Sequence, residues 1–196
     1  VHLSTQCSTL NLKTIEFYKE LGIDRIVLAR ELNLKEIEHI VKHSPLPIEV
    51  FIHGAMCMSY SGRCMLSNHM TLRDANRGGC AQVCRFAFGT NEEKDFTLAT
   101  KDINMARHIK DMIDIGVCSL KVEGRMRTLY YLATVIGTYR EIIDRIYDNT
   151  LTDDIMEVLE YRLSKVANRE VSTHFFNKEA DYTDQYYTGR QELSNQ

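Results

Sequence analysis

Short apolar runs, each followed by a segment of helical period, dominate the hydrophobic pattern of the chain. This alternation is typical of consecutive βα units in a parallel sheet. The apolar runs predict strands over residues 1–6, 25–29, 48–53 and 117–123. The helical periods predict helices over residues 11–21, 33–42, 100–115, 129–147 and 153–166. The pattern therefore predicts an α/β fold with about four βα units.

Four such units match half of an eight-stranded TIM-type barrel, while an open parallel sheet of four strands is the simpler alternative. The alternation breaks over residues 54–99, which contain four of the six cysteines. Because insertions of this length in compact domains are usually functional, we expect the chemistry of the protein to involve this stretch. A polar tail with little periodicity follows the last predicted helix.

Charge and composition narrow the class of protein. The 196 residues carry a net charge of −3, which excludes a protein that coats nucleic acid through its overall charge but leaves room for a local basic patch. The chain has no run of eighteen apolar residues and no basic-then-apolar leader. We therefore expect a soluble, cytoplasmic protein without a membrane span.

Polar residues gather where the predicted strands end. In a barrel, one side-chain parity of each strand faces the helices and the other faces the lumen, and the chemistry lies at the carboxyl ends of the strands. This parity predicts that five polar side chains converge at one rim, where they would hold an anion and move a proton: Gln6, Arg30, His53, Lys121 and Glu123. The alternative is that they are ordinary hydrogen-bonded residues at strand ends.

The four clustered cysteines have the spacing Cys57-x6-Cys64-x15-Cys80-x3-Cys84. Clustered thiols in a reducing compartment suggest a metal site. Neither pair has the Cys-x2-Cys spacing of a zinc ribbon, and the tight spacings of ferredoxins are also absent. From the spacing alone, a 4Fe-4S cluster, a zinc ion and unligated thiols all stay open.

Arginines crowd the same stretch, with Asp74 as its one acid. Four of them lie close to the cysteines, and a fifth follows the last predicted strand: Arg63, Arg73, Arg77, Arg85 and Arg125. The guanidinium fork suits phosphate and carboxylate groups, so these residues could bind RNA or an acidic substrate. They could equally compensate the negative charge of four thiolates.

Several segments together resemble the collagenase-like peptidase family U thirty-two. The main signature is Glu49-x-Phe51-x2-Gly54-Ala55-Met56-Cys57-x4-Gly62-x-Cys64-x-Leu66-Ser67. Further agreement lies in residues 4–6, 28–32, 76–80 and 121–126, so that the resemblance extends over about residues 1–176. The residues contain no His-Glu-x-x-His motif and no Gly-x-Ser-x-Gly elbow, which does not fit the peptidase name.

The resemblance implies a TIM-type barrel and a 4Fe-4S cluster bound by Cys57, Cys64, Cys80 and Cys84. Residues 1–148 would be the C-terminal half of the barrel, with residues 54–99 as its cluster-binding insertion and residues 149–196 as a helical extension and polar tail. Family members are longer at both ends, which leaves the activity of this chain alone open.

The resemblance also implies oxygen-independent hydroxylation of RNA. One branch converts the wobble uridine of tRNA to 5-hydroxyuridine with prephenate as hydroxyl source. Here we expect His53, Lys121 and Glu123 as catalytic residues, and the substrate would be bound by Gln6, Arg30, Arg77, Arg85 and Arg125. A collagenase-like peptidase and an inactive, metal-stabilised half-barrel with a partner chain are the alternatives. tRNA is the expected partner, together with a homo- or hetero-oligomer that includes a paralogous family member.

Overall fold

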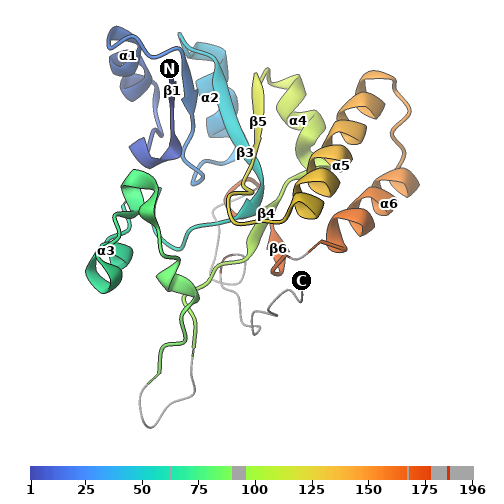
Figure 1. Cartoon of the computed structure of the whole chain (residues 1–196). Coiled ribbons are helices and arrows are strands. Elements are labelled where there is room, and N and C mark those ends of the chain that lie inside the picture. Colours follow the sequence, from blue (N-terminus) through green and yellow to red (C-terminus); the bar gives the residue numbers. More distant parts are fainter. Residues whose placement is uncertain (62, 90–95, 167, 178–184, 186–196) are drawn as a thin grey trace.

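The computed structural model describes residues 1–61, 63–89, 96–166, 168–177 and 185. These residues contain a six-stranded mixed sheet with helices beside it (Figure 1). The longest strand, β3 (Ile48–Ala55), pairs with three others. It is parallel to β2 and β5 and antiparallel to β4, while β1 extends the sheet from β2 and β6 extends it from β4. The bounds of the other strands are β1 His2–Leu3, β2 Arg25–Val27, β4 Asp102–Asn104, β5 Ser119–Val122 and β6 Val171–Ser172.

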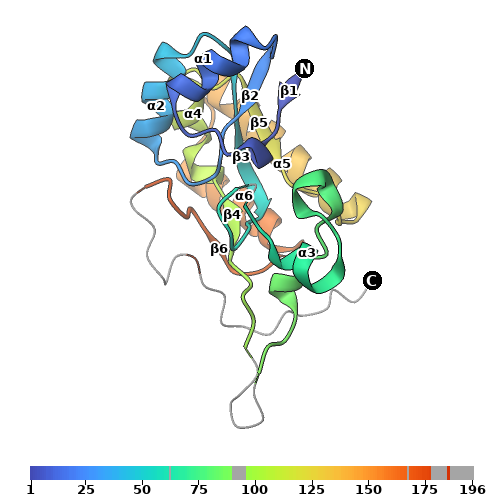
Figure 2. The ribbon, with the colours of Figure 1, turned by 90° about the vertical axis from the view of Figure 1, so that its left-hand side faces the viewer.

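Four of the α-helices begin after a residue whose side chain caps them: Asn11, Asn33, Thr128 and Thr152. The Asn33 side chain accepts from the Glu36 amide and Glu36 returns the contact, which completes a capping box. The α-helices are α1 Leu12–Glu20, α2 Leu34–His43, α3 Leu66–Thr71, α4 Ile109–Asp114, α5 Leu129–Tyr147 and α6 Asp153–Ser164. Shorter helical turns are η1 Thr5–Cys7, η2 Ala75–Gly79, η3 Val83–Arg85 and η4 Ala106–His108. Figures 1 and 2 show α1 and α2 beside β1 and β2, and α5 and α6 packed together beyond β5.

The apolar core lies between the sheet and these helices. Ile26, Ile52 and Ile109 are almost fully buried, and Val135 and Ile142 of α5 contribute from the helix layer. Burial of such side chains contributes roughly 1.5–3 kcal/mol each to folding. The predicted α/β class is therefore confirmed, and membership of a TIM-type barrel stays a prediction.

One predicted helix is wrong in its first half. Residues 100–115 begin with the strand β4 and the turn η4, and only Ile109–Asp114 form the expected α-helix. The reason is tertiary: the Met105 amide donates to the Ile52 carbonyl, and Asp102 is buried against arginines from other segments. The short strand β6 was also not predicted. Most of the predicted polar tail lies outside the described residues.

Within the described part of the chain, every helix is too short or too polar to cross a lipid bilayer.

Candidate functional site

The cysteine segment, residues 56–101, leaves the sheet at the carboxyl end of β3 and returns at β4 (Figure 1). The exit requires a glycine at position 54, whose φ is +105°. A Cβ atom there would lie 2.5 Å from the Glu123 carbonyl oxygen, because the ends of β3 and β5 approach closely. The Gly54 of the family signature thus has a physical reason.

Two residues at the end of β2 hold the first loop of the cysteine segment. The Glu31 carboxylate accepts from the Ser61 amide at 2.8 Å and from the Ser61 hydroxyl at 3.0 Å. The Arg30 guanidinium donates to the Ala55 carbonyl at 3.2 Å and stabilises the Cys57 thiolate. Arg30, predicted to bind substrate, therefore also braces the backbone beside a cysteine.

A buried serine joins the second half of the segment. Ser67 on α3 is fully buried; its hydroxyl donates to the Arg73 carbonyl at 2.7 Å and accepts from the Ala81 amide at 3.0 Å. This contact ties the helix that follows Cys64 to the turn that carries Cys80. At the far end, the Thr100 hydroxyl donates to the Met56 carbonyl at 2.9 Å. Polar contacts therefore fix the positions of the loops that carry the cysteines.

The four cysteines influence one another electrostatically. Burial raises the pKa of the Cys57 thiol, and negative charge on Cys64 or Cys80 raises it further. Burial also raises the pKa of Cys84, with Cys57 and Cys80 adding to the effect and Arg85 and Arg169 opposing it. All four are free of disulfides. Among the described residues, no three His, Cys, Asp or Glu side chains are arranged to hold one metal ion, so the ligand set stays a prediction.

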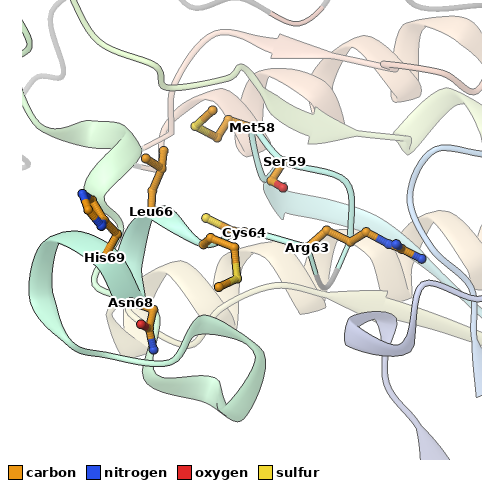
Figure 3. Close-up of a pocket in the computed structure, with 8 residues that line it drawn as sticks. Met58, Ser59, Arg63, Cys64, Leu66, Asn68 and His69 are labelled. Atoms are coloured by element: carbon orange, nitrogen blue, oxygen red, sulfur yellow. The ribbon is translucent and has the colours of Figure 1, made fainter.

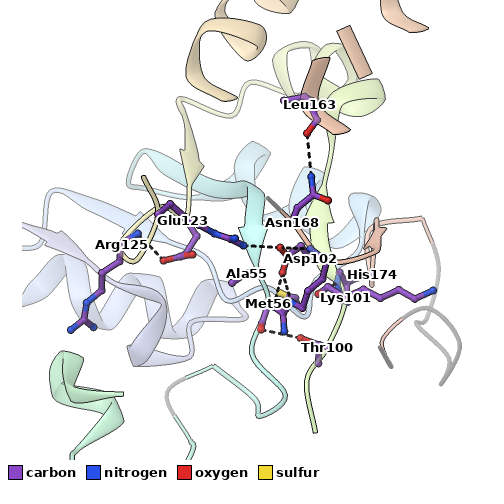
Figure 4. Close-up of polar contacts among 12 residues, drawn as sticks. Ala55, Met56, Thr100, Lys101, Asp102, Glu123, Arg125, Leu163, Asn168 and His174 are labelled. Atoms are coloured by element: carbon purple, nitrogen blue, oxygen red, sulfur yellow. Dashed lines mark hydrogen bonds and ion pairs between the residues drawn. The ribbon is translucent and has the colours of Figure 1, made fainter. Parts of the chain in front are cut away.

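A buried cluster of charges lies beside Cys84, and we call it the Asp102 cluster (Asp102, Arg85, Arg127 and Arg169). Asp102 is 1% exposed. Its carboxylate accepts from Arg169 Nη2 at 2.5 Å and Nε at 2.8 Å, and from Arg127 Nη2 at 2.9 Å (Figure 4). Burial lowers the pKa of Arg85, and the charges of Arg169 and Arg127 lower it further. The guanidinium groups of Arg127 and Arg169 thus share the Asp102 carboxylate, and Arg85 lies close enough to interact with the charges of this cluster.

His53 does not face the expected rim. A register shift between Phe51 and His53 places His53 opposite Val122, so the parity of β3 changes at that point. The His53 ring is 1% exposed and its Nδ1 lies 3.1 Å from the Tyr139 hydroxyl on α5. Burial lowers the pKa of His53 to about 4. The expected face shared with Lys121 is therefore wrong for His53, which packs into the helix layer.

The remaining rim residues separate into two groups. Lys121 and Arg30 both lie over the Phe51 ring at 5.3 Å, and Lys121 Nζ is 3.3 Å from the carboxylate of Glu49. Glu49 was not among the predicted site residues.

Glu123 and Gln6 make local contacts instead. A Glu123 carboxylate oxygen accepts from the Arg125 amide at 3.0 Å. Gln6 accepts hydrogen bonds from the hydroxyls of Ser4 and Thr5 in η1. The structure therefore brings Arg30 and Lys121 together and records no contact of Gln6 with either among the described residues.

The other predicted arginines are exposed. Arg63, Arg73, Arg77 and Arg125 all have open side chains. Arg125 comes from the loop after β5, yet a Cβ atom on Gly78 would lie 3.9 Å from its guanidinium. The end of β5 and the turn η2 thus present Arg125 and Arg77 on neighbouring stretches of surface. Exposed and buried arginines form two distinct populations around the cysteines.

Sequence reasoning missed Asp102, Arg169 and Ser67 as members of the site. Asp102 lies within the helix predicted over residues 100–115, and an acid in such a helix is typical of the exposed surface. Arg169 lies 67 residues away along the chain from its partner, a separation that no local pattern encodes. Ser67 was part of the signature, but its two partners depend on the path of the following loop.

Comparisons with known proteins find similar sequences over most of the chain. The profile described as Peptidase family U32 matches residues 1–186. "tRNA hydroxylation protein P1" of Bacillus subtilis is 44% identical over 200 residues, which cover 95% of this chain and 47% of that protein. "23S rRNA 5-hydroxycytidine C2501 synthase" of Escherichia coli is 37% identical and covers 76% of this chain and 24% of its own length.

A third relative has a different name. "Collagenase" of Porphyromonas gingivalis is 36% identical over 86% of this chain and 45% of its own length. The chain thus spans about half the length, or less, of these curated relatives. No solved structure matches the chain significantly.

Proposed function

Because this chain belongs to peptidase family U32, we propose that the protein containing it hydroxylates RNA, with the wobble uridine of tRNA as target and 5-hydroxyuridine as product. The observation that carries the proposal is the 44% identity with a tRNA hydroxylation protein across 95% of the chain. A second relative is named for making 5-hydroxycytidine in ribosomal RNA, which is the same change on another pyrimidine.

We further propose that Cys57, Cys64, Cys80 and Cys84 hold a 4Fe-4S cluster. Such a cluster supplies one-electron chemistry to an enzyme when it is bound. The donor set fits by its chemistry, because four thiols within one segment offer the soft sulfur ligands that iron-sulfur clusters take. The Asp102 cluster supports the assignment, since the positive charges of its members Arg85 and Arg169 act on the Cys84 thiol. Four thiolates around such a cluster are net negative and are stabilised by such neighbours.

The arginines then have different roles in this proposal. Arg85, Arg127 and Arg169 compensate charge in the interior, while Arg77 and Arg125 on the surface bind the phosphates of the RNA. Lys121 and Glu123 remain the candidates for holding the hydroxyl donor, with prephenate as the proposed source, and for moving protons. The hydroxyl group would come from this donor and not from dioxygen.

The name of the collagenase relative makes a peptidase the second candidate. Nucleophilic catalysis needs a nucleophile and a base within hydrogen-bond reach. Among the described residues, no histidine ring nitrogen bonds to a cysteine thiol or a serine hydroxyl. The described side chains therefore show no bonded pair of the kind that serine and cysteine peptidases use.

The test is nucleoside mass spectrometry of tRNA from cells that carry the full-length protein, a gene deletion, or the Cys57→Ser variant. We expect 5-hydroxyuridine to disappear in the deletion and to fall at least 10-fold with Cys57→Ser, together with the iron content of the purified protein. Cys118→Ser is the matched control, because the Cys118 thiol is exposed and donates to the Ile48 carbonyl, at the opposite end of β3 from the cysteine segment. Unchanged hydroxyuridine in the deletion would disprove the proposed function.

A further inference from the structure

A groove of about 590 Å³ lies beside Cys64 on the outer side of α3. Its walls are largely apolar and come from Met58, Met65 and Leu66 (Figure 3). Met65 is 68% exposed and Met58 is 36% exposed, so the groove presents thioether side chains to the solvent. Flexible, polarisable thioethers pack well against aromatic rings. The volume lies within the roughly 300–1,000 Å³ that small ligands occupy.

Polar side chains stand at the edge of this apolar surface. Arg63, Asn68 and His69 line the groove and are exposed, and none of their side chains bonds to another described residue. An asparagine amide offers one acceptor and two donors on a single plane, which matches the edge of a pyrimidine base. The Arg63 guanidinium, which extends away from Asn68 in Figure 3, suits a phosphate.

The groove is held in place from behind. Ser67 lies between Leu66 and Asn68, and its buried hydroxyl fixes α3 to the backbone at Arg73 and Ala81. The Thr71 hydroxyl also donates to the Ser67 carbonyl at 2.6 Å. Leu66, Asn68 and His69 of the groove therefore belong to a fixed helix, which lowers the cost of ordering them when a ligand arrives.

The charge around the groove favours an anionic ligand. Within residues 57–89 the sequence has four arginines and a single acid, Asp74. An apolar wall with a cationic edge is the combination that binds a nucleotide, because the base covers the wall and the phosphate meets the arginines. Enzymes that modify a base take it out of its stack before they react with it.

We propose that this groove receives the unstacked target pyrimidine of the RNA, an inference that rests on the proposed hydroxylation of RNA. The base lies against Met58 and Met65, the Asn68 amide pairs with the edge of the base, and Arg63 binds the adjacent phosphate. The base is thereby placed next to Cys64, one of the four proposed cluster ligands.

Photo-crosslinking of the full-length protein tests the position of the base directly. The probe is an anticodon stem-loop RNA with 5-iodouridine at the wobble position, and the crosslinked peptide is identified by mass spectrometry. We expect the crosslink within residues 58–69. A crosslink in another segment, with normal hydroxyuridine in cells, overturns the groove and leaves the proposed function intact. No crosslink together with unchanged hydroxyuridine in the gene deletion overturns both.

Matched variants test the contribution of the apolar wall. Met65→Glu replaces an apolar thioether by a carboxylate that repels the phosphates of the RNA, so it should reduce crosslinking and hydroxyuridine about 10-fold or more. Met70→Glu is the control, because Met70 lies on the same helix and is 46% exposed but does not line the groove. Both side chains are exposed, so both variants should fold. Equal effects of the two substitutions would contradict the proposal.

Discussion

Two regions of this chain are held together by different forces. The sheet and its helices, residues 1–55 and 102–166, contain nearly all of the buried apolar side chains. Among the described residues, the cysteine segment buries only three apolar side chains, those of Met56, Val83 and Ala99. It is fixed instead by polar contacts such as Ser61 with Glu31 and Ser67 with Ala81.

This difference has a consequence for stability and function. Apolar packing is cooperative and contributes to the stability of the whole domain, whereas a few hydrogen bonds stabilise a segment that opens locally. The segment with the proposed chemistry is therefore expected to be the less stable of the two. A bound metal cluster would stabilise this segment through metal–thiolate bonds.

The Asp102 cluster fixes β4, the strand that follows the cysteine segment, to Arg127 and Arg169, so its removal should have the largest effect on stability. Asp102→Asn leaves the buried guanidinium groups of Arg127 and Arg169 without their carboxylate, which should lower the free energy of unfolding by about 3–5 kcal/mol. Urea denaturation measures this change. Asp144→Asn is the control, because it removes an exposed ion pair with Arg140 and should leave stability nearly unchanged. A loss below about 1 kcal/mol for Asp102→Asn would show that the two guanidinium groups do not need this carboxylate in the folded protein.

The buried histidines predict that the free energy of unfolding depends on pH. Burial lowers the pKa values of His53 and His174 to about 4, from 6.5. Between these values the unfolded chain binds protons that the folded chain excludes, so stability is fully present above pH 6.5 and falls as the pH drops toward 4. Each histidine should contribute a slope of about 1.4 kcal/mol per pH unit in this window.

Urea denaturation between pH 7 and pH 5 measures this slope. His53→Phe should decrease it by about the contribution of one histidine, about 1.4 kcal/mol per pH unit. Ile142→Val, a core substitution that costs about 0.5–1.5 kcal/mol, should lower stability at every pH without changing the slope. An unchanged slope in His53→Phe would mean that the His53 ring binds protons equally in the folded and unfolded states.

The sequence predicted the first of these regions much better than the second. Helix α5 appears where its apolar period predicts it, at Leu129–Tyr147, because local periodicity and tertiary burial agree there. Residues 102–104 were misjudged, because pairing with β3 and the buried contacts of Asp102 override a helical pattern. The four cysteines were visible as a group through their spacing alone.

The side-chain faces of β3 and β5 were predicted in part from the alternation along each strand. The alternation correctly placed Glu49, Phe51 and Lys121 on one face of β3 and β5, where Lys121 lies over Phe51 and pairs with Glu49. It failed for His53, because a single register shift reverses the faces of a strand. Neither the shift nor the partners of Ser67 leave a local mark in the sequence.

A smaller, local effect is expected in the cysteine segment. Ser67→Ala removes the acceptor of the Ala81 amide and the donor to the Arg73 carbonyl, a loss of about 1–3 kcal/mol if both groups stay buried. Because the segment opens locally, we expect faster hydrogen exchange at the Ala81 amide and little change at α5. Ser164→Ala, at the end of α6 and exposed, serves as the control. Equal acceleration of exchange in α5 would show that the two regions unfold as one.

The smallest effect concerns tRNA binding by the exposed arginines. It tests whether the cysteine segment binds the phosphates of the RNA. Each phosphate contact releases counterions, so Arg77→Gln should weaken binding of tRNA to the full-length protein and reduce the dependence of log K on log salt by about 1. Lys13→Gln removes the same charge from α1, where the side chain pairs with Glu16, and should leave the salt dependence unchanged. Binding measured by fluorescence anisotropy at several salt concentrations gives both slopes. Equal reductions in the two variants would mean that the RNA is attracted by the charge of the whole chain, and Arg77 would then have no specific role in binding.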